Sequence, residues 1–163
     1  MDIQKATLEQ LIPLNNLFDQ YRRFYDKSSD LKKSEQFLKE RIERKESEIY
    51  ISWEGNTATG FVQLFPLFSS TRLARYWLLN DLYVHPNYRG EGISKALIEQ
   101  AKQLCRDTNA CGMYLETGID NNFGNTLYPA MGFKRMNSVN FYEWSTSSAA
   151  LETGIESSRN EKF

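Results

Sequence analysis

The chain has 163 residues with a formal net charge of -1; 40% of its residues are hydrophobic and 25% are charged. This length suits one domain, and the balanced charge argues against a protein that coats nucleic acid. The apolar runs are too short for a transmembrane helix and the N-terminus lacks the apolar core of a signal peptide, so we expect a cytoplasmic protein. The two cysteines and the single histidine, His85, match no metal-ligand or disulfide pattern, so we expect reduced thiols and no bound metal.

Hydrophobic periodicity and turn signals predict a mixed α/β chain. The order is one strand, two helices, three strands, a helix, a strand, a short helix and two final strands. Thr7 and Gln10 form a capping box before the first helix, and Pro13 lies inside the apolar pattern of that helix. The predicted elements lie within residues 1–7, 11–25, 28–47, 48–53, 57–65, 76–84, 93–107, 112–117, 121–131, 133–136 and 140–144.

The middle of the chain predicts one strand–helix–strand crossover. It connects residues 76–84 through the helix at 93–107 to residues 112–117, so these two strands should be parallel. The hairpins should be antiparallel. From residue 145 onward the sequence is polar and aperiodic, and we expect 145–163 to be a flexible tail.

The loop before the helix at 93–107 has the composition of an anion site. Arg89, Gly90 and Gly92 lead into a helix start, where free backbone N–H groups and the helix dipole favour a phosphate. Glycine is also what a turn with positive φ angles requires, and this simpler interpretation stays open. A Walker loop of the form G-x-x-x-x-G-K-(S/T) is not present, and a dinucleotide fingerprint would need a small residue where Lys95 stands.

Two motifs resemble those of the GNAT superfamily, the Gcn5-related N-acetyltransferases. "YRGEGISKAL" after "LYVHPN" is similar to the pyrophosphate-binding signature (Q/R)-x-x-G-x-(G/A), with Arg89, Gly92 and Ser94 at the signature positions. Ser94 departs from the usual glycine or alanine. "NNFGNTLYPAMGF" resembles the segment N-x-x-(A/N)-x-x-L-Y-x-x-x-G-F. We map this second motif on Asn122, Asn125, Leu127, Tyr128, Gly132 and Phe133.

The resemblance covers residues 1–144 and implies a single-domain GNAT fold with a flexible tail at 145–163. That fold has a central mixed, mostly antiparallel sheet of about seven strands with a splayed parallel strand pair, flanked by helices, of which we expect four. The implied activity is direct transfer of an acetyl group from the cosubstrate acetyl-CoA to a primary amine of a small molecule, a peptide or a protein. Relatives often pair through edge strands, so the resemblance also allows a homodimer.

Other functions stay open at this point. A CoA-binding module without catalysis would keep the phosphate loop, and a transferase could use an acyl donor other than acetyl-CoA. A structural or partner-binding domain would make the two motifs coincidental. Binding of acetyl-CoA and release of thiol with amines would separate these classes.

The resemblance also implies how the cofactor is held. Its diphosphate would lie on the N–H groups from Arg89 to Ser94, and its pantetheine arm would pair with the strand that ends at Val84. The implied cofactor-binding residues are Leu82, Tyr83, Val84, Arg89, Gly90, Glu91, Gly92, Ile93, Ser94, Asn122 and Tyr128.

The catalytic residues follow from the same resemblance. Tyr128 is implied as the general acid that protonates the departing thiolate. For the base that takes the proton of the amine we choose Asp81, with Glu116 or water as the alternatives. Strand alternation predicts that Asp81 shares a face with Trp77 and Leu79.

The acceptor cleft in this family lies between the first two helices and the loop that joins the third and fourth strands. Inward-pointing arginines would favour an amino acid or another acidic amine, whereas a polyamine or a basic protein tail would need acidic walls, such as Asp19, Asp26 and Asp30. Ordinary helix packing is the simpler interpretation for Tyr21 and Tyr25. The candidate acceptor residues are Tyr21, Arg22, Phe24, Tyr25, Phe68, Arg75 and Asn80.

Overall fold

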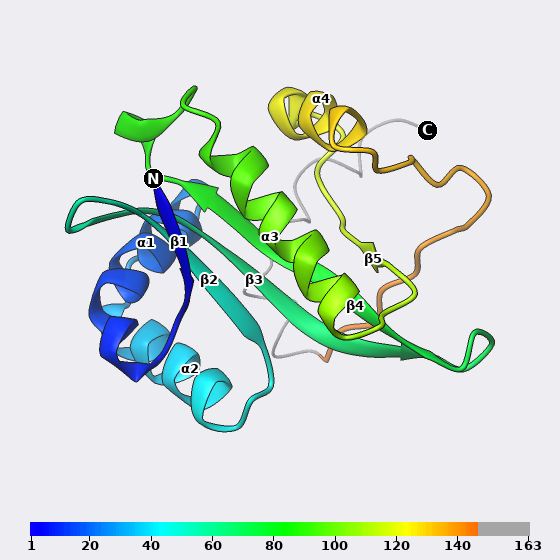
Figure 1. The fold of residues 1–163 in the computed structure, drawn as a ribbon, viewed down its shortest axis with the longest axis horizontal. Coiled ribbons are helices and arrows are strands. Elements are labelled where there is room, and N and C mark those ends of the chain that lie inside the picture. The colour runs from blue at the N-terminus through cyan, green and yellow to red at the C-terminus, as the bar shows by residue number, and fades with distance from the viewer. Residues whose placement is uncertain (147–163) are drawn as a thin grey trace. The chain divides into compact units, whose positions relative to one another are not determined.

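A computed structural model describes residues 1–146. Within them the sheet has five strands in the order β1-β2-β3-β4-β5, antiparallel except for the predicted parallel pair β4 and β5 (Figure 1). The strands are β1 (Asp2–Lys5), β2 (Glu48–Glu54), β3 (Thr57–Ser69), β4 (Ala74–Val84) and β5 (Met113–Tyr114). The α-helices are α1 (Leu11–Phe24), α2 (Leu31–Glu43), α3 (Ile93–Asp107) and α4 (Asn122–Ala130), with short 3-10 helices at Leu8–Gln10 and Pro86–Tyr88.

The two final strands of the sequence prediction do not form. Residues 1–133 make one compact unit, and a second unit begins at residue 134. No residue from 133 to 146 is in a strand, so the described sheet has five strands and not about seven. Phe141 and Tyr142 are exposed, so the segment 140–144 packs neither of these rings on an apolar surface. The tail predicted at 145–163 lies, from residue 147 on, outside the described residues.

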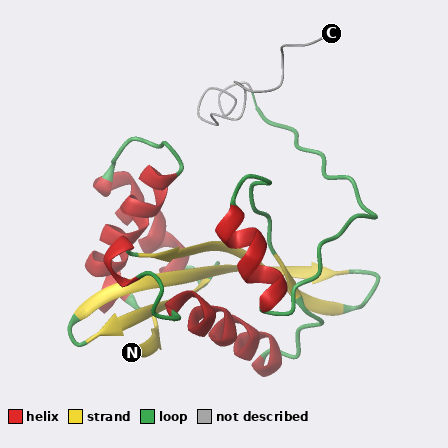
Figure 2. Ribbon diagram, turned by 90° about the horizontal axis from the view of Figure 1, so that it is seen from above, coloured by secondary structure: helices red, strands yellow, loops and turns green. Residues whose placement is uncertain are grey.

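The sheet separates two apolar clusters. On one face, α3 packs through Leu97 against Val62 of β3. On the other face, α1 and α2 pack through Leu14 and Leu38 against Phe61. Neighbouring residues of β3 therefore point to opposite cores, as the two-residue period of a strand requires. Figure 2 shows helices on both sides of the strands. Within residues 1–146, none of the helices has the length and apolar character that crossing a membrane requires.

The start of α1 follows the predicted signals. The backbone N–H of Thr7 donates to Gln10 Oε1 at 2.9 Å, and the Thr7 hydroxyl accepts from the N–H of Glu9 at 3.2 Å, which confirms the capping box. Pro13 lies in the first turn of α1, where its missing N–H would have had no partner within the helix. The helix therefore continues through it to Phe24.

A β-bulge in β4 changes which residues face which core. Gln63 of β3 pairs with Asp81 and the next residue of β3 pairs with Leu79, so Asn80 has no partner. The extra residue reverses the alternation along the strand. Trp77 and Leu79 pack in the cluster with α3. Asp81 instead faces α1, where the hydroxyl of Tyr21 donates a hydrogen bond to it. The prediction that Asp81 shares a face with Trp77 and Leu79 is therefore wrong.

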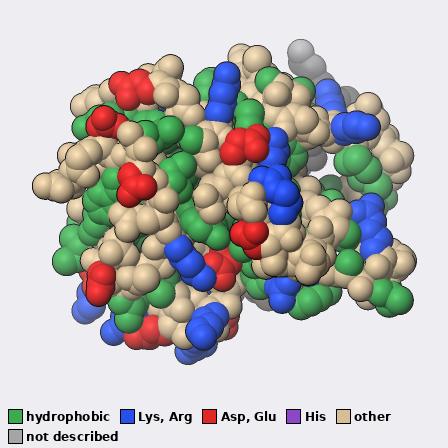
Figure 3. All heavy atoms as spheres, in the orientation of Figure 1, with side chains coloured by type: hydrophobic (Ala, Val, Ile, Leu, Met, Phe, Trp, Pro, Cys, Tyr) green, Lys and Arg blue, Asp and Glu red, His purple; other side chains and the backbone are tan. Residues whose placement is uncertain are grey.

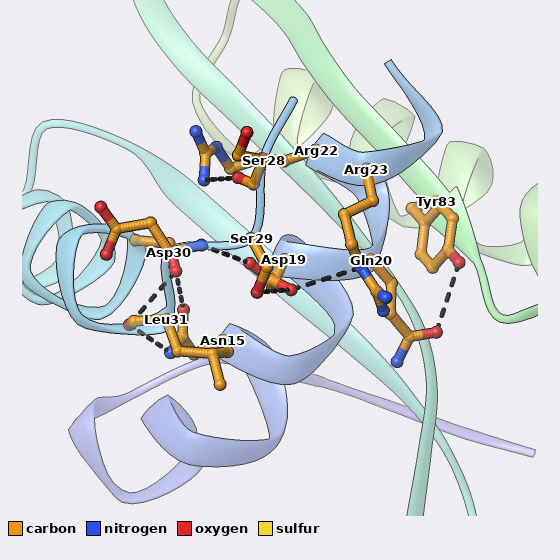
Figure 4. A network of polar contacts seen from close by, with 11 residues as sticks. Asn15, Asp19, Gln20, Arg22, Arg23, Ser28, Ser29, Asp30, Leu31 and Tyr83 are labelled. Atoms are coloured by element: carbon orange, nitrogen blue, oxygen red, sulfur yellow. Dashed lines mark hydrogen bonds and ion pairs between the residues drawn. The ribbon is translucent and has the colours of Figure 1, made fainter. Parts of the chain in front are cut away.

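Polar side chains join α1 to the start of α2 (Figure 4). The buried Asn15 amide donates to the carbonyl of Leu31 at 2.9 Å. The buried carboxylate of Asp19 accepts from the Ser29 hydroxyl at 2.9 Å and from the N–H of Asp30 at 3.1 Å. These bonds fix the loop that follows the last turn of α1.

Replacing Asn15 with alanine is expected to lower the free energy of unfolding by about 1–3 kcal/mol, because the Ser34 hydroxyl and the Leu31 carbonyl both lose a buried partner. Urea titration monitored by circular dichroism measures the change in the free energy of unfolding. Asn16→Ala is the matched control, since Asn16 is exposed on the same helix, and we expect a change below about 0.5 kcal/mol. Equal losses in the two variants would contradict a stabilising role for the buried amide.

Candidate active site

A cavity of about 590 Å³ lies where β4 extends beyond β5. Its walls come from the last turns of α1, the second half of β4, the loop into α3, the segment after β5, and α4. Most of the wall is aromatic or apolar, and its charged residues are Arg89, Lys95 and Glu116. By contrast, acidic and basic side chains lie interspersed on the face drawn in Figure 3.

β4 has one edge without a strand partner at this cavity. It pairs with β3 along its length, but with β5 only at Trp77 and Leu78. Beyond Leu78, the backbone on that edge is therefore available to the amide groups of a ligand. Leu82, Tyr83 and Val84, which were predicted to bind the cofactor, all line the cavity.

The glycine loop forms a cradle at the start of α3. Gly90 and Gly92 have φ angles of 85° and 82°, and an added Cβ on either residue would meet nothing within 4 Å. The first helical bond runs from the N–H of Ala96 to the carbonyl of Gly92, and the N–H groups of residues 93–95 have no partner within residues 1–146. Both interpretations of the glycines therefore apply: the backbone needs positive φ, and the open space beside free N–H groups suits a diphosphate.

The side chain of Arg89 holds the loop in place. Its Nε donates to the carbonyl of Val84 at 3.1 Å. Its guanidinium carbon lies 5.9 Å from the ring centroids of both Phe24 and Tyr83. The charge is thus directed toward β4 and α1. Glu91, which was also predicted to bind the cofactor, does not line the cavity.

Tyr128 lies on the cavity wall and is part of α4. Its ring meets that of Phe133 edge to face, with 5.8 Å between the centroids. Burial raises the pKa of Tyr128 to about 12, and the charge interaction with Tyr25 adds to the rise. The phenol therefore keeps its proton at neutral pH and is available as a proton donor.

Asp81, the predicted base, lies behind the wall and not on it. Only 4% of its surface is exposed, and its carboxylate accepts from Gln63 Nε2 at 2.7 Å and from Asn80 Nδ2 at 3.0 Å. Burial raises the pKa of Asp81, and hydrogen bonds from Gln63, Asn80 and Tyr21 oppose that rise. Glu116, the alternative base, does line the cavity.

Part of the predicted acceptor set meets in the cavity. Tyr21, Phe24 and Tyr25 contribute the α1 side of the wall, and Asn80 contributes from the bulge of β4. The rings of Tyr21 and Tyr25 pack edge to face at 5.1 Å, and those of Phe24 and Tyr25 at 5.3 Å. The last turns of α1 therefore present a continuous aromatic surface.

Three other predicted acceptor residues do not line the cavity. Arg22 donates to the carbonyl of Ser28 at 3.3 Å. Arg75 lies over the ring of Phe68, 4.9 Å from its centroid, near the tip of the β3–β4 hairpin. A strand rises about 3.3 Å per residue, so Arg75 is roughly 20 Å from Leu82. The predictions for Arg22, Phe68 and Arg75 therefore have no support from the cavity.

Comparison with known proteins assigns the chain to a family. Residues 14–133 match the model of the Acetyltransferase (GNAT) family. The chain belongs to this family. An uncharacterized N-acetyltransferase, YhfO, of Bacillus subtilis (strain 168) is 38% identical over 134 residues, which cover 82% of this chain and 90% of YhfO.

Solved structures agree with this assignment. One solved structure is the crystal structure of a probable acetyltransferase, whose sequence is 39% identical to this chain. The two structures superpose with a TM-score of 0.86, and the match covers 90% of this chain and 99% of that one. The aminoglycoside N-acetyltransferase AAC(6')-Iy, solved in complex with CoA, shares the GNAT fold at 19% identity, with a TM-score of 0.75 over 89% of this chain and 95% of that one. This chain is therefore an acetyltransferase with the GNAT fold.

The second GNAT motif begins at Asn121 and not at Asn122. Asn121 caps α4 by accepting from the N–H of Gly124 at 3.0 Å, donates to the Thr117 hydroxyl at 2.9 Å, and lines the cavity. Asn122 does not line it. Counting the motif back from Tyr128 reaches Asn121, and the (A/N) position then falls on Gly124 and not on Asn125. A Cβ on Gly124 would come within 2.7 Å of Asn121 Nδ2 and 3.1 Å of Tyr128 Cε2.

Several further residues line the cavity of this GNAT protein although the sequence did not predict them as site residues. They come from separate segments that only the folded chain brings together. These residues are Leu79, Tyr88, Lys95, Thr117, Phe123, Thr126, Leu127 and Ala130.

The titratable residues around the cavity offer two cations, one carboxylate and phenol groups. Within residues 1–146, no three His, Cys, Asp or Glu side chains come close enough together to hold a metal ion.

Proposed function

We propose that this GNAT acetyltransferase moves the acetyl group of acetyl-CoA to a primary amine. The observation that carries the proposal is a single cavity that combines the anion cradle at Gly90 and Gly92, the unpaired edge of β4 and the protonated phenol of Tyr128. The cradle suits the diphosphate of the cofactor, and the edge suits the amides of its pantetheine arm. The CoA complex of a protein with the same fold supports this choice of cofactor.

Acetyl-CoA supplies a thioester, whose carbonyl carbon bonds to the amine nitrogen as the C–S bond breaks. The N–H groups of residues 93–95 hold the diphosphate, and a backbone N–H of β4 near Leu82 donates to the carbonyl oxygen as it becomes negative. Tyr128 gives its proton to the departing sulfur. Glu116, the one acidic residue among those that line the cavity, accepts the proton that the nitrogen loses. In this proposal Glu116 takes the role first expected of Asp81, because Asp81 lies behind the wall.

Calorimetric titration with acetyl-CoA, followed by an assay of thiol release with a panel of primary amines, tests the proposal. We expect binding, and release of thiol that depends on the amine. Binding without release would favour a CoA-binding module. Release with propionyl-CoA or succinyl-CoA, but not with acetyl-CoA, would favour another acyl donor. Absence of acetyl-CoA binding would contradict the proposed function and also the alternative of a CoA-binding module.

We further propose that the domain extends to residue 144 and that it forms a homodimer. The family resemblance, which covers residues 1–144, supports the first, and the pairing of relatives through their edge strands supports the second. Size-exclusion chromatography with light scattering on the full chain measures the mass in solution. A monomer mass would contradict the homodimer.

A further inference from the structure

Asp81 is a buried carboxylate with neutral partners. The amides of Gln63 and Asn80 and the hydroxyl of Tyr21 donate to it. No Lys or Arg within residues 1–146 forms an ion pair with it. A charge in a site of low dielectric constant attracts a cation more strongly than one in water does. Asp81 therefore has neutral donors and no cationic partner within residues 1–146, and a cation that approaches it would favour its ionised form.

Tyr21 connects this carboxylate to the cavity. Its ring lines the wall and its hydroxyl is bonded to Asp81, which leaves the phenol oxygen able to accept from a ligand N–H. Tyr128 lines the same cavity, so an amine that reaches Tyr21 shares one cavity with the proposed proton donor.

The α1 side of the cavity offers an apolar surface next to the hydroxyl of Tyr21. Phe24 is 60% exposed and Tyr25 is 50% exposed, which leaves large parts of both rings free to contact a ligand. Rings of this kind contribute through stacking and through contact with a cation. An acceptor with an aromatic or aliphatic body would bury both rings.

The acidic residues that a polycation would need are not on the wall. Asp19 is bonded to Ser29 and lies 3.4 Å from the Nε of Arg23, and Asp30 caps α2. Neither of them, nor Asp26, lines the cavity. Among the residues that do, Glu116 is the one acidic residue, so the wall offers fewer carboxylates than a polyamine or an aminoglycoside has positive charges.

We propose that the acceptor is a primary amine with one positive charge on an aromatic or other apolar body. This inference rests on the proposed function. The ammonium group lies at Tyr21 in front of Asp81, and the body packs against Phe24 and Tyr25. Glu116 takes one proton from the ammonium and passes it to water, which frees the nitrogen lone pair to attack, and it then takes the second proton of the nitrogen as the C–S bond breaks.

Thiol release from acetyl-CoA, measured in parallel with 2-phenylethylamine, spermidine, kanamycin and a lysine-rich peptide, tests the inference. We expect kcat/KM for 2-phenylethylamine to exceed the others about fivefold, since one aromatic contact contributes about 1 kcal/mol. Preference for any of the other three overturns the inference and leaves the proposed function standing, because acetyl transfer has occurred. No release with any amine overturns the proposed function, and the inference with it.

Two variants test the residues themselves. Tyr25→Ala is expected to lower kcat/KM for 2-phenylethylamine about tenfold without changing the affinity for acetyl-CoA. Ile12→Ala is the matched control, because Ile12 is exposed on the same helix and does not line the cavity. Asp81→Asn is expected to raise KM for the amine about tenfold and to leave KM for acetyl-CoA unchanged. An unchanged amine KM in Asp81→Asn, or equal losses in Tyr25→Ala and Ile12→Ala, overturns the inference.

Discussion

Replacing Tyr128 with phenylalanine is expected to lower kcat about 100-fold, the usual loss when a general acid is removed. The affinity for acetyl-CoA should stay the same, because the cradle at residues 90–95 is untouched. The fold should also persist, since phenylalanine keeps the edge-to-face contact with Phe133. Initial rates at saturating acetyl-CoA, with calorimetry for binding, measure both quantities.

The control for this variant is Tyr114→Phe, which removes a phenol outside the cavity and should leave kcat unchanged. The pH profile adds a second readout. Because burial raises the pKa of Tyr128 to about 12, the phenol is protonated below that value and loses its proton only as the pH rises through it. The wild-type rate should therefore show no alkaline fall from Tyr128 between about pH 7 and 9. A kcat equal to that of the wild type would remove Tyr128 from the mechanism.

Gly92→Asp is expected to raise the KM for acetyl-CoA about 100-fold. Two unit charges about 4 Å apart repel by about 4 kcal/mol at an effective dielectric constant of about 20, and exposure to solvent reduces this. The new carboxylate would stand in the open space beside the free N–H groups of residues 93–95. Steady-state kinetics with varied acetyl-CoA give the KM.

Two further variants separate charge from backbone strain. Gly92→Ala brings in a Cβ at a φ of 82° without a charge, so it should raise KM much less. Gly55→Asp makes the same chemical change at another glycine with a positive φ of 56° and open space, in the turn between β2 and β3, and should leave KM unchanged. A KM for Gly92→Asp that matches the wild type would mean that the diphosphate binds elsewhere.

Local patterns were enough to predict the elements from β1 to α4. The capping box of Thr7 and Gln10 depends on residues three apart, and helix faces depend on a period of about 3.6 residues. The parallel pairing of β4 with β5 followed from the handedness of the crossover. The strands expected at 133–136 and 140–144 do not form. A short segment becomes a strand only where it pairs with the edge of a sheet and packs its side chains on an apolar surface, and the segment alone does not specify either.

The candidate site was predictable where a contiguous motif forms it. The loop from Arg89 to Ser94 and Tyr128 both reach the cavity, and correct counting of the second motif would also have identified Asn121. The place of Asp81 was not predictable, because a one-residue bulge at Asn80 turns it toward α1.

By itself, the sequence determined the family, the order of the elements from β1 to α4 and the position of the glycine loop, because each of these depends on short contiguous patterns. Only the tertiary structure decided which carboxylate stands on the wall. It placed Glu116 there and Asp81 behind Tyr21, and it left Phe68 and Arg75 at the far end of the hairpin. The physical reason is that strand register and the meeting of distant segments depend on the pairing and packing of the whole chain.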